Sequence, residues 1–85
     1  MLIAPVVNLN GTSRDALVDQ HVAAALSLEK ALAALIETAP HPRDFQTVKQ
    51  EQYRQARAQY EDRVRRLHEI IKEVESIGTQ IYEQG

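Results

Sequence analysis

The residues best suited to chemistry in this 85-residue chain lie in the stretch APHPRDF, residues 39–45. His41 and Arg43 can donate hydrogen bonds to an anion, and the planar fork of arginine suits phosphate or carboxylate. Phe45 offers a ring for stacking, and Asp44 offers a carboxylate that caps a helix or accepts from a hydroxyl. Two prolines would hold these groups with little entropy lost on binding. We interpret the stretch either as an anion-binding loop or as a turn with a helix cap.

A second candidate site is NLNGTSRD, residues 8–15. Asn10 and the hydroxyls of Thr12 and Ser13 lie where a helix is expected to begin, and the positive end of the helix dipole favours an anion there. The stretch lacks the lysine and the glycine count of a P-loop, so it does not predict an ATPase. The alternative is a turn in which Thr12 or Ser13 caps the helix.

Two arginines of the second half, Arg57 and Arg63, complete the predicted ligand-binding set. Arg63 interrupts an apolar stripe, and counting back from the bend places it opposite His21. It is therefore either a partly buried cation that holds an anionic group or an exposed side chain at the edge of the seam.

Other chemistry has little support. The three histidines lie on separate parts of the chain, cysteine is absent, and no metal-binding motif occurs, so we predict a non-enzyme with no metal or cofactor. The net charge of −2 argues against nucleic acid as a partner. No apolar run approaches the roughly 20 residues that span a membrane, so no membrane association is expected.

The spacing of apolar residues, together with the helix-capping and helix-breaking residues, predicts the secondary structure that positions these residues. We predict one domain over 1–85, with an extended arm over 1–12, a helix over 13–38, a bend over 39–43 and a second helix over 44–82. Pro40 and Pro42 end the first helix and Asp44 caps the second. The predicted apolar stripe of the first helix is Leu17, His21, Ala24, Leu28, Ala31 and Leu35, and that of the second is Tyr53, Ala56, Tyr60, Arg63, Leu67, Ile70, Val74, Ile77 and Ile81.

A short bend makes the two helices antiparallel, so the predicted fold is an all-α antiparallel two-helix hairpin. We expect the longer second helix to leave its C-terminal end, around residues 70–81, without enough apolar partners in one chain. The hairpin is therefore predicted to assemble into a helical-bundle homo-oligomer.

The combination of NLNGTS, APHPRDF and ARAQYEDRVRRL resembles a family of small phage and prophage helical-hairpin proteins. The family pattern has an N-G-T-S start, a P-H-G-R-D-Y-Y bend and an A-x-x-x-H-x-x-R-x-x-x-L stretch in the second helix. The resemblance covers residues 8 to about 67. This chain departs from it at Pro42 for Gly, at Phe45 for Tyr and at Tyr60 for His.

A looser likeness of size and shape links such proteins to sponges that sequester nucleotide signals of bacterial immunity, as in the Thoeris and CBASS systems. It implies a non-catalytic phage anti-defence protein that binds a small anionic nucleotide-derived ligand in the host bacterial cytoplasm. The alternative is a coiled-coil protein-interaction module that inhibits a host protein or serves in phage assembly. A pocket shared between the bend of one subunit and the arm of its neighbour is the expected ligand site.

Overall fold

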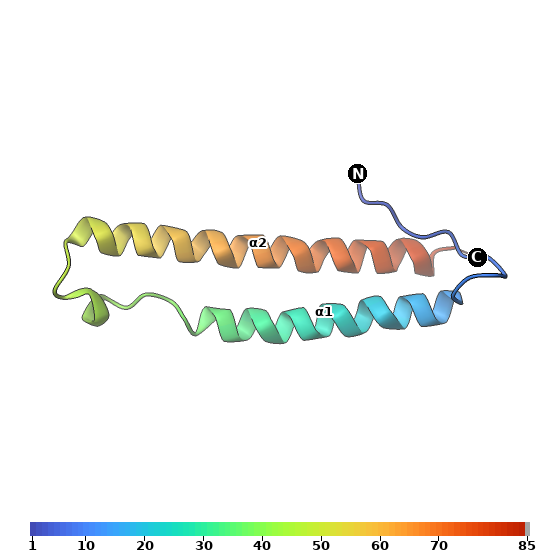
Figure 1. The fold of residues 1–85 in the computed structure, drawn as a ribbon, viewed down its shortest axis with the longest axis horizontal. Coiled ribbons are helices and arrows are strands. Elements are labelled where there is room, and N and C mark those ends of the chain that lie inside the picture. Colours follow the sequence, from blue (N-terminus) through green and yellow to red (C-terminus); the bar gives the residue numbers. More distant parts are fainter. Residues whose placement is uncertain (85) are drawn as a thin grey trace.

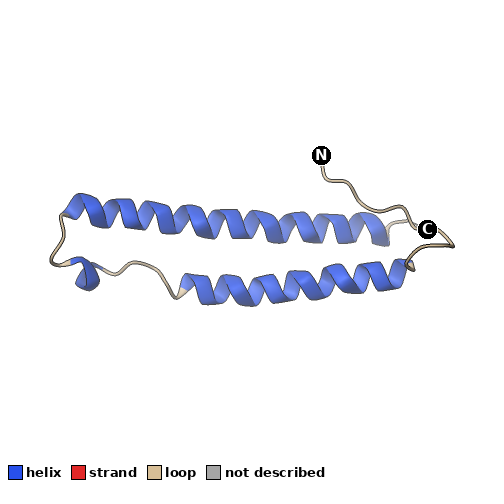
Figure 2. Cartoon of the chain, viewed as in Figure 1, coloured by secondary structure: helices blue, strands red, loops and turns tan. Residues whose placement is uncertain are grey.

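The chain forms a rod of two antiparallel helices, as the computed structural model shows for residues 1–84 (Figure 1). Helix α1 spans Arg14–Ile36, a 3-10 turn η1 spans Pro42–Phe45, and helix α2 spans Gln50–Tyr82. No strand occurs among the described residues (Figure 2). The rod measures 62 × 23 × 16 Å. The predicted all-helical hairpin is confirmed.

Helix α1 begins at a side-chain cap. Ser13 Oγ accepts from the Ala16 N–H at 3.2 Å, and Asp15 lies in the first turn beside the positive end of the helix dipole. Ser13 is thus the cap, one of the two hydroxyls that the sequence offered. The helix ends at Ile36, two residues earlier than predicted, where Thr38 Oγ1 donates to Leu35 O at 2.6 Å.

The start of α2 differs from the prediction, because Asp44 lies in η1 and the helix begins six residues later at Gln50. Phe45 packs edge-on against Tyr53, with ring centroids 5.5 Å apart, and this contact turns the chain back before the helix can start. Lys49 occupies the N-cap position with extended backbone. The Gln52 side chain accepts from the Lys49 N–H at 3.3 Å, which is half of a capping box.

The apolar seam of α2 has a different phase from the predicted one. Both stripes contain Tyr60, Leu67, Val74 and Ile81, which recur every seventh residue. Of the residues that the predicted seam adds, 63 and 70 are exposed and 77 is half-buried, whereas 71 and 78 are buried and 64 is half-buried. Ile71 is 2% exposed and Ile70 is 48% exposed. The placement of Arg63 in the seam is therefore wrong.

Gly78 explains this phase. A Cβ at Gly78 would lie 3.2 Å from the Cβ of His21, so the helices lie close together at this residue, which has no side chain. Sequence spacing alone reads Ile77 as the better core residue. The close approach instead places Gly78 in the interface, and Gly78 is buried.

The relative placement of the helices also corrects an expectation. Gly78 lies against His21, and the Tyr60 hydroxyl donates to Ile36 O at 3.1 Å. Helix α1 therefore covers about the C-terminal two thirds of α2, and the surplus length of α2 lies beside the bend. The predicted bare C-terminal end is wrong: Ile81 is fully buried. The bend over residues 37–49 is longer than expected and accompanies the first turns of α2.

The N-terminal arm runs beside the C-terminal end of α2, and Figure 1 shows both termini toward the same end of the rod. Gln84 fixes it, because its side chain accepts from the Val7 N–H at 2.8 Å and donates to Pro5 O at 2.7 Å. Arg14 Nη1 donates to the backbone oxygen of Gln84 at 3.1 Å. These contacts close the open end of the hairpin.

Candidate functional site

The bend presents its polar residues on an ordered turn. The Nδ1 atom of His41 accepts from the Arg43 N–H at 3.2 Å, and the Tyr53 hydroxyl donates to Pro40 O at 3.5 Å. Phe45 is half-buried against Tyr53. The side chains of His41, Arg43 and Asp44 are exposed. Most of the stretch therefore builds the turn, and Arg43 is its exposed cation.

The predicted arm residues form a turn and a helix cap. Asn8 Oδ1 accepts from the Asn10 N–H at 3.0 Å, and the Gly11 N–H donates to Asn8 O at 3.2 Å. Asn10, Thr12 and Ser13 are exposed, and the Ser13 hydroxyl is engaged by the cap. This group lies at the opposite end of the rod from the bend (Figure 1). One chain therefore cannot bring the two groups to one small ligand.

The two predicted cations of α2 do not form a buried site. Arg57 pairs with Glu61 at 3.2 Å and lies over the Tyr60 ring, 5.6 Å from its centroid. Arg63 is exposed, and because Tyr60 meets Ile36 it lies near the C-terminal end of α1 rather than opposite His21. Within one chain Arg63 matches the exposed alternative, and a role in an anion site formed between copies stays a prediction.

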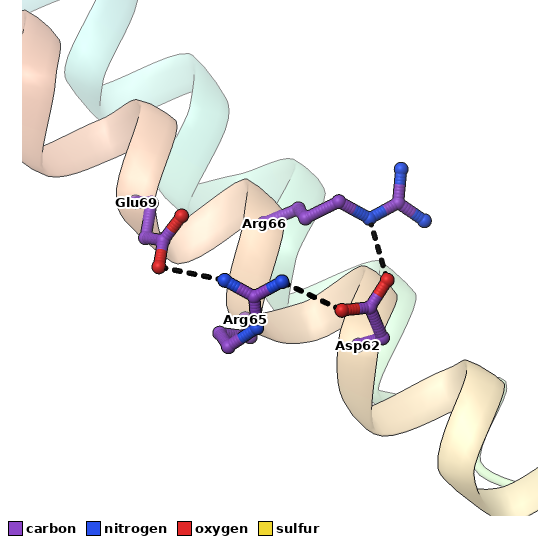
Figure 3. A network of polar contacts seen from close by, with 4 residues as sticks. All are labelled: Asp62, Arg65, Arg66 and Glu69. Atoms are coloured by element: carbon purple, nitrogen blue, oxygen red, sulfur yellow. Dashed lines mark hydrogen bonds and ion pairs between the residues drawn. The ribbon is translucent and has the colours of Figure 1, made fainter.

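The neighbouring arginines are engaged with carboxylates on the outer face of α2 (Figure 3). Arg65 pairs with Asp62 at 2.6 Å and with Glu69 at 2.8 Å, and Arg66 pairs with Asp62 at 2.9 Å. The hydrogen bond from Arg65 lowers the pKa of Asp62 below its usual 3.8. These exposed pairs satisfy one another, so this face has little free positive charge for an anion.

A groove of about 360 Å³ runs along one side of the hairpin near the arm. Its floor is apolar, and its rim carries Glu29 from α1 and Glu75 from α2. The full set of lining residues is Val18, His21, Val22, Ala25, Leu26, Glu29, Val74, Glu75, Gly78, Thr79 and Tyr82. The sequence analysis did not single out this surface as a site.

His21 is the polar residue of α1 that lies against Gly78 of α2. Its Nδ1 lies 2.7 Å from Leu17 O, and because a carbonyl oxygen only accepts, Nδ1 carries the proton. The hydrogen bond is therefore within α1 and holds the ring along its own helix. In this structure His21 is a satisfied histidine of the helix interface, where the sequence suggested a partner for Arg63.

Helix α1 leaves three large hydrophobic side chains exposed, at Val22, Leu26 and Ile36. Between Asp19 and Glu29 it has no charged residue, and its hydrophobic residues surround the helix rather than forming one stripe. A helix that is apolar all round is usually buried on all sides. Here Ala25 is its one buried residue, while Val22 is 52% exposed and Leu26 is 55% exposed. The charge-free run is the sequence signal that marks this surface.

No family model, curated protein or solved structure matches this chain. Within the described residues, neither helix combines the length and the hydropathy that crossing a membrane requires.

Proposed function

We propose that this chain is a non-catalytic protein-interaction module that works as a homo-oligomer. The observation that carries the proposal is the exposed apolar surface of α1, where Val22 and Leu26 lie beside a groove with an apolar floor. Water contact at such a surface is unfavourable by about 25 cal/mol for each Å² of apolar area, and a second helical surface removes that cost. The exposed apolar surface therefore favours a hairpin that binds another helical surface over one that stays a monomer.

The experiment is thermal unfolding followed by circular dichroism across a hundredfold range of protein concentration. An oligomer gains native stability by mass action, so its melting temperature should rise with concentration. Leu26→Gln should lower the melting temperature at high concentration and remove the concentration dependence. Ser27→Gln, on the adjacent exposed position, is the matched control. A melting temperature that is constant over the whole range would contradict the proposal.

A second candidate function is sequestration of a small anionic nucleotide-derived ligand, as a phage anti-defence protein in a bacterial cytoplasm would perform. The observation that favours it is Arg43, which is held on an ordered turn, is exposed, and has no carboxylate within 4.0 Å among residues 1–84. An unpaired guanidinium on a fixed loop is suited to phosphate. Thr12 and Ser13 of a neighbouring subunit would supply further donors.

The test is a thermal-shift panel of cyclic dinucleotides and ADP-ribose at concentrations up to about 1 mM. A ligand present at about 100 times its Kd adds about 2.7 kcal/mol of native stability. Arg43→Ala should abolish that gain, whereas Lys72→Ala, which removes an exposed positive charge from α2, should preserve it. No gain with any nucleotide, or the same gain in both variants, would reject this candidate.

A further inference from the structure

We infer that α1 pairs with α1 of a second copy of this chain in an antiparallel, two-fold symmetric dimer centred at the level of Ala24. The inference rests on the proposed function and names its partner and register. A two-fold interface must be self-complementary, so that each contact occurs twice. Helix α1 carries both an apolar pair and a charged pair that satisfy this condition.

The apolar pair is Val22 and Leu26. They lie two residues before and two residues after Ala24, so antiparallel pairing about that level places Val22 of each copy against Leu26 of the other. Both side chains are about half exposed in one chain. The neighbouring Ala23 is small, which permits close approach of the two helices. Each copy thereby covers the exposed apolar surface of the other.

The charged pair is Asp19 and Lys30. Asp19 lies five residues before Ala24 and Lys30 six residues after it, so the two lie within about 1.5 Å of the same level in the antiparallel dimer. They are eleven residues apart, about three helical turns, and so project from the same edge of α1. A two-fold axis perpendicular to the plane of the two helices keeps this edge of both copies on the same side of the dimer. Asp19 of each copy therefore faces Lys30 of the other.

Within one chain these two residues do not pair. They are about 16 Å apart along α1, and neither has an ion-pair partner within 4.0 Å among the described residues. Most arginines of the hairpin, by contrast, are paired with carboxylates of their own helix. Glu29 is also near the level of Asp19 in the dimer, but it projects from the other edge, where it lines the groove towards α2.

The same register has a consequence for the candidate ligand site. Ile36 and Thr12 lie twelve residues to either side of Ala24, so the C-terminal end of α1 in one copy comes level with Thr12 of the second copy. The bend follows directly after that end. Antiparallel pairing therefore brings the bend of one copy towards the arm turn of the other, the two groups that one chain keeps apart.

Charge reversal tests the register directly. Asp19→Lys and Lys30→Asp each convert two ion pairs into two like-charge contacts and should weaken the dimer by about tenfold. The double variant restores both pairs with the charges exchanged, so it should dimerise as the native chain does. Lys72→Asp, an equal charge change on exposed α2, is the control and should leave the dimer unchanged. Sedimentation velocity at about 0.1 M salt gives the Kd of each variant.

The outcomes separate the register from the proposed function. Weakened dimerisation of both single variants and native dimerisation of the double variant support the register, provided that circular dichroism shows equal helix content in all of them. An oligomeric native chain whose single variants dimerise normally, or whose double variant is as weak as the singles, overturns the register and leaves the proposed function standing. A monomeric native chain overturns both.

Discussion

Two adjacent isoleucines provide a sharp test of the helix packing. Ile71 is 2% exposed in the seam against α1, whereas Ile70 is 48% exposed. Replacing either with alanine makes the same chemical change in the same helix, and both gain equally from the better helix propensity of alanine, a few tenths of a kcal/mol. The difference between the two variants in their loss of unfolding free energy therefore depends on burial alone.

The magnitude follows from the burial. Removing a fully buried isoleucine to alanine costs about 2–5 kcal/mol, and a two-helix core open to solvent at its sides should give the lower end, about 2–3 kcal/mol. The half-exposed Ile70 loses less apolar contact and leaves no enclosed cavity, so its replacement should cost less than about 1 kcal/mol.

The assay is urea unfolding followed by circular dichroism at 222 nm, with all proteins at one concentration because the proposed association would contribute to stability. We expect the Ile71→Ala midpoint to fall well below that of Ile70→Ala, with similar slopes. Equal losses, or a larger loss for Ile70→Ala, would refute the seam phase described here and favour the one that sequence spacing alone suggests.

Three further predictions concern single contacts. Tyr60→Phe removes the hydroxyl that donates to Ile36 O and should cost about 0.5–1.5 kcal/mol in the same urea assay, and an unchanged midpoint would show that the bond contributes nothing. Gln84→Ala removes both side-chain contacts to the arm, so hydrogen exchange at the Val7 amide should accelerate while α2 amides stay protected; unaltered Val7 protection would contradict the bridge. The pKa of Asp62 is lowered in the folded chain. The carboxylate therefore stabilises the folded chain fully at pH values above its ordinary pKa of 3.8, and this stabilisation disappears as the pH falls through the lower pKa of the folded chain. Helix content should therefore fall more in the native protein than in Asp62→Asn over that acid range, and parallel acid titrations would rule this out.

The sequence predicted the architecture because its signals there are local. Apolar spacing predicted two helices, the prolines ended the first, and Ser13 was recognisable as a cap. The start of α2 was missed because Asp44 is a good cap by type, yet Phe45 packing on Tyr53 takes the preceding segment into a separate turn. The preference of aspartate for the N-cap position was overridden by a tertiary contact that the spacing of residues in the sequence does not reveal.

The seam phase was missed for a different reason. Apolar residues at 60, 67, 74 and 81 fit two heptad assignments, and the choice between them depends on whether Ile77 or Gly78 faces α1. Sequence reasoning prefers the larger apolar side chain, whereas a side chain at residue 78 would begin 3.2 Å from the His21 Cβ, which is a tight contact. The predicted position of Arg63 depended on the heptad assignment that includes residue 63 and on a bend that was predicted too short. Both errors placed Arg63 in the helix interface, where it does not lie.

The candidate ligand residues were identified by type, and the structure separates them by role. Ser13 and Phe45 have structural contacts that account for them, and Arg57 is paired with Glu61. Arg43 keeps an exposed charge on an ordered loop. The exposed apolar surface of α1 was the feature that residue chemistry did not single out, because its signal is the absence of charge between Asp19 and Glu29.

The central claim is that this hairpin completes its core by pairing with a second copy. Sedimentation equilibrium of the native chain at about 10 to 100 µM tests it most directly, because that method gives mass independently of shape and a 62 Å rod misleads size-based methods. We expect a mass of twice the 9.6 kDa of one chain, or a monomer–dimer equilibrium that shifts to the dimer with concentration. A single species of 9.6 kDa across the whole range would contradict it.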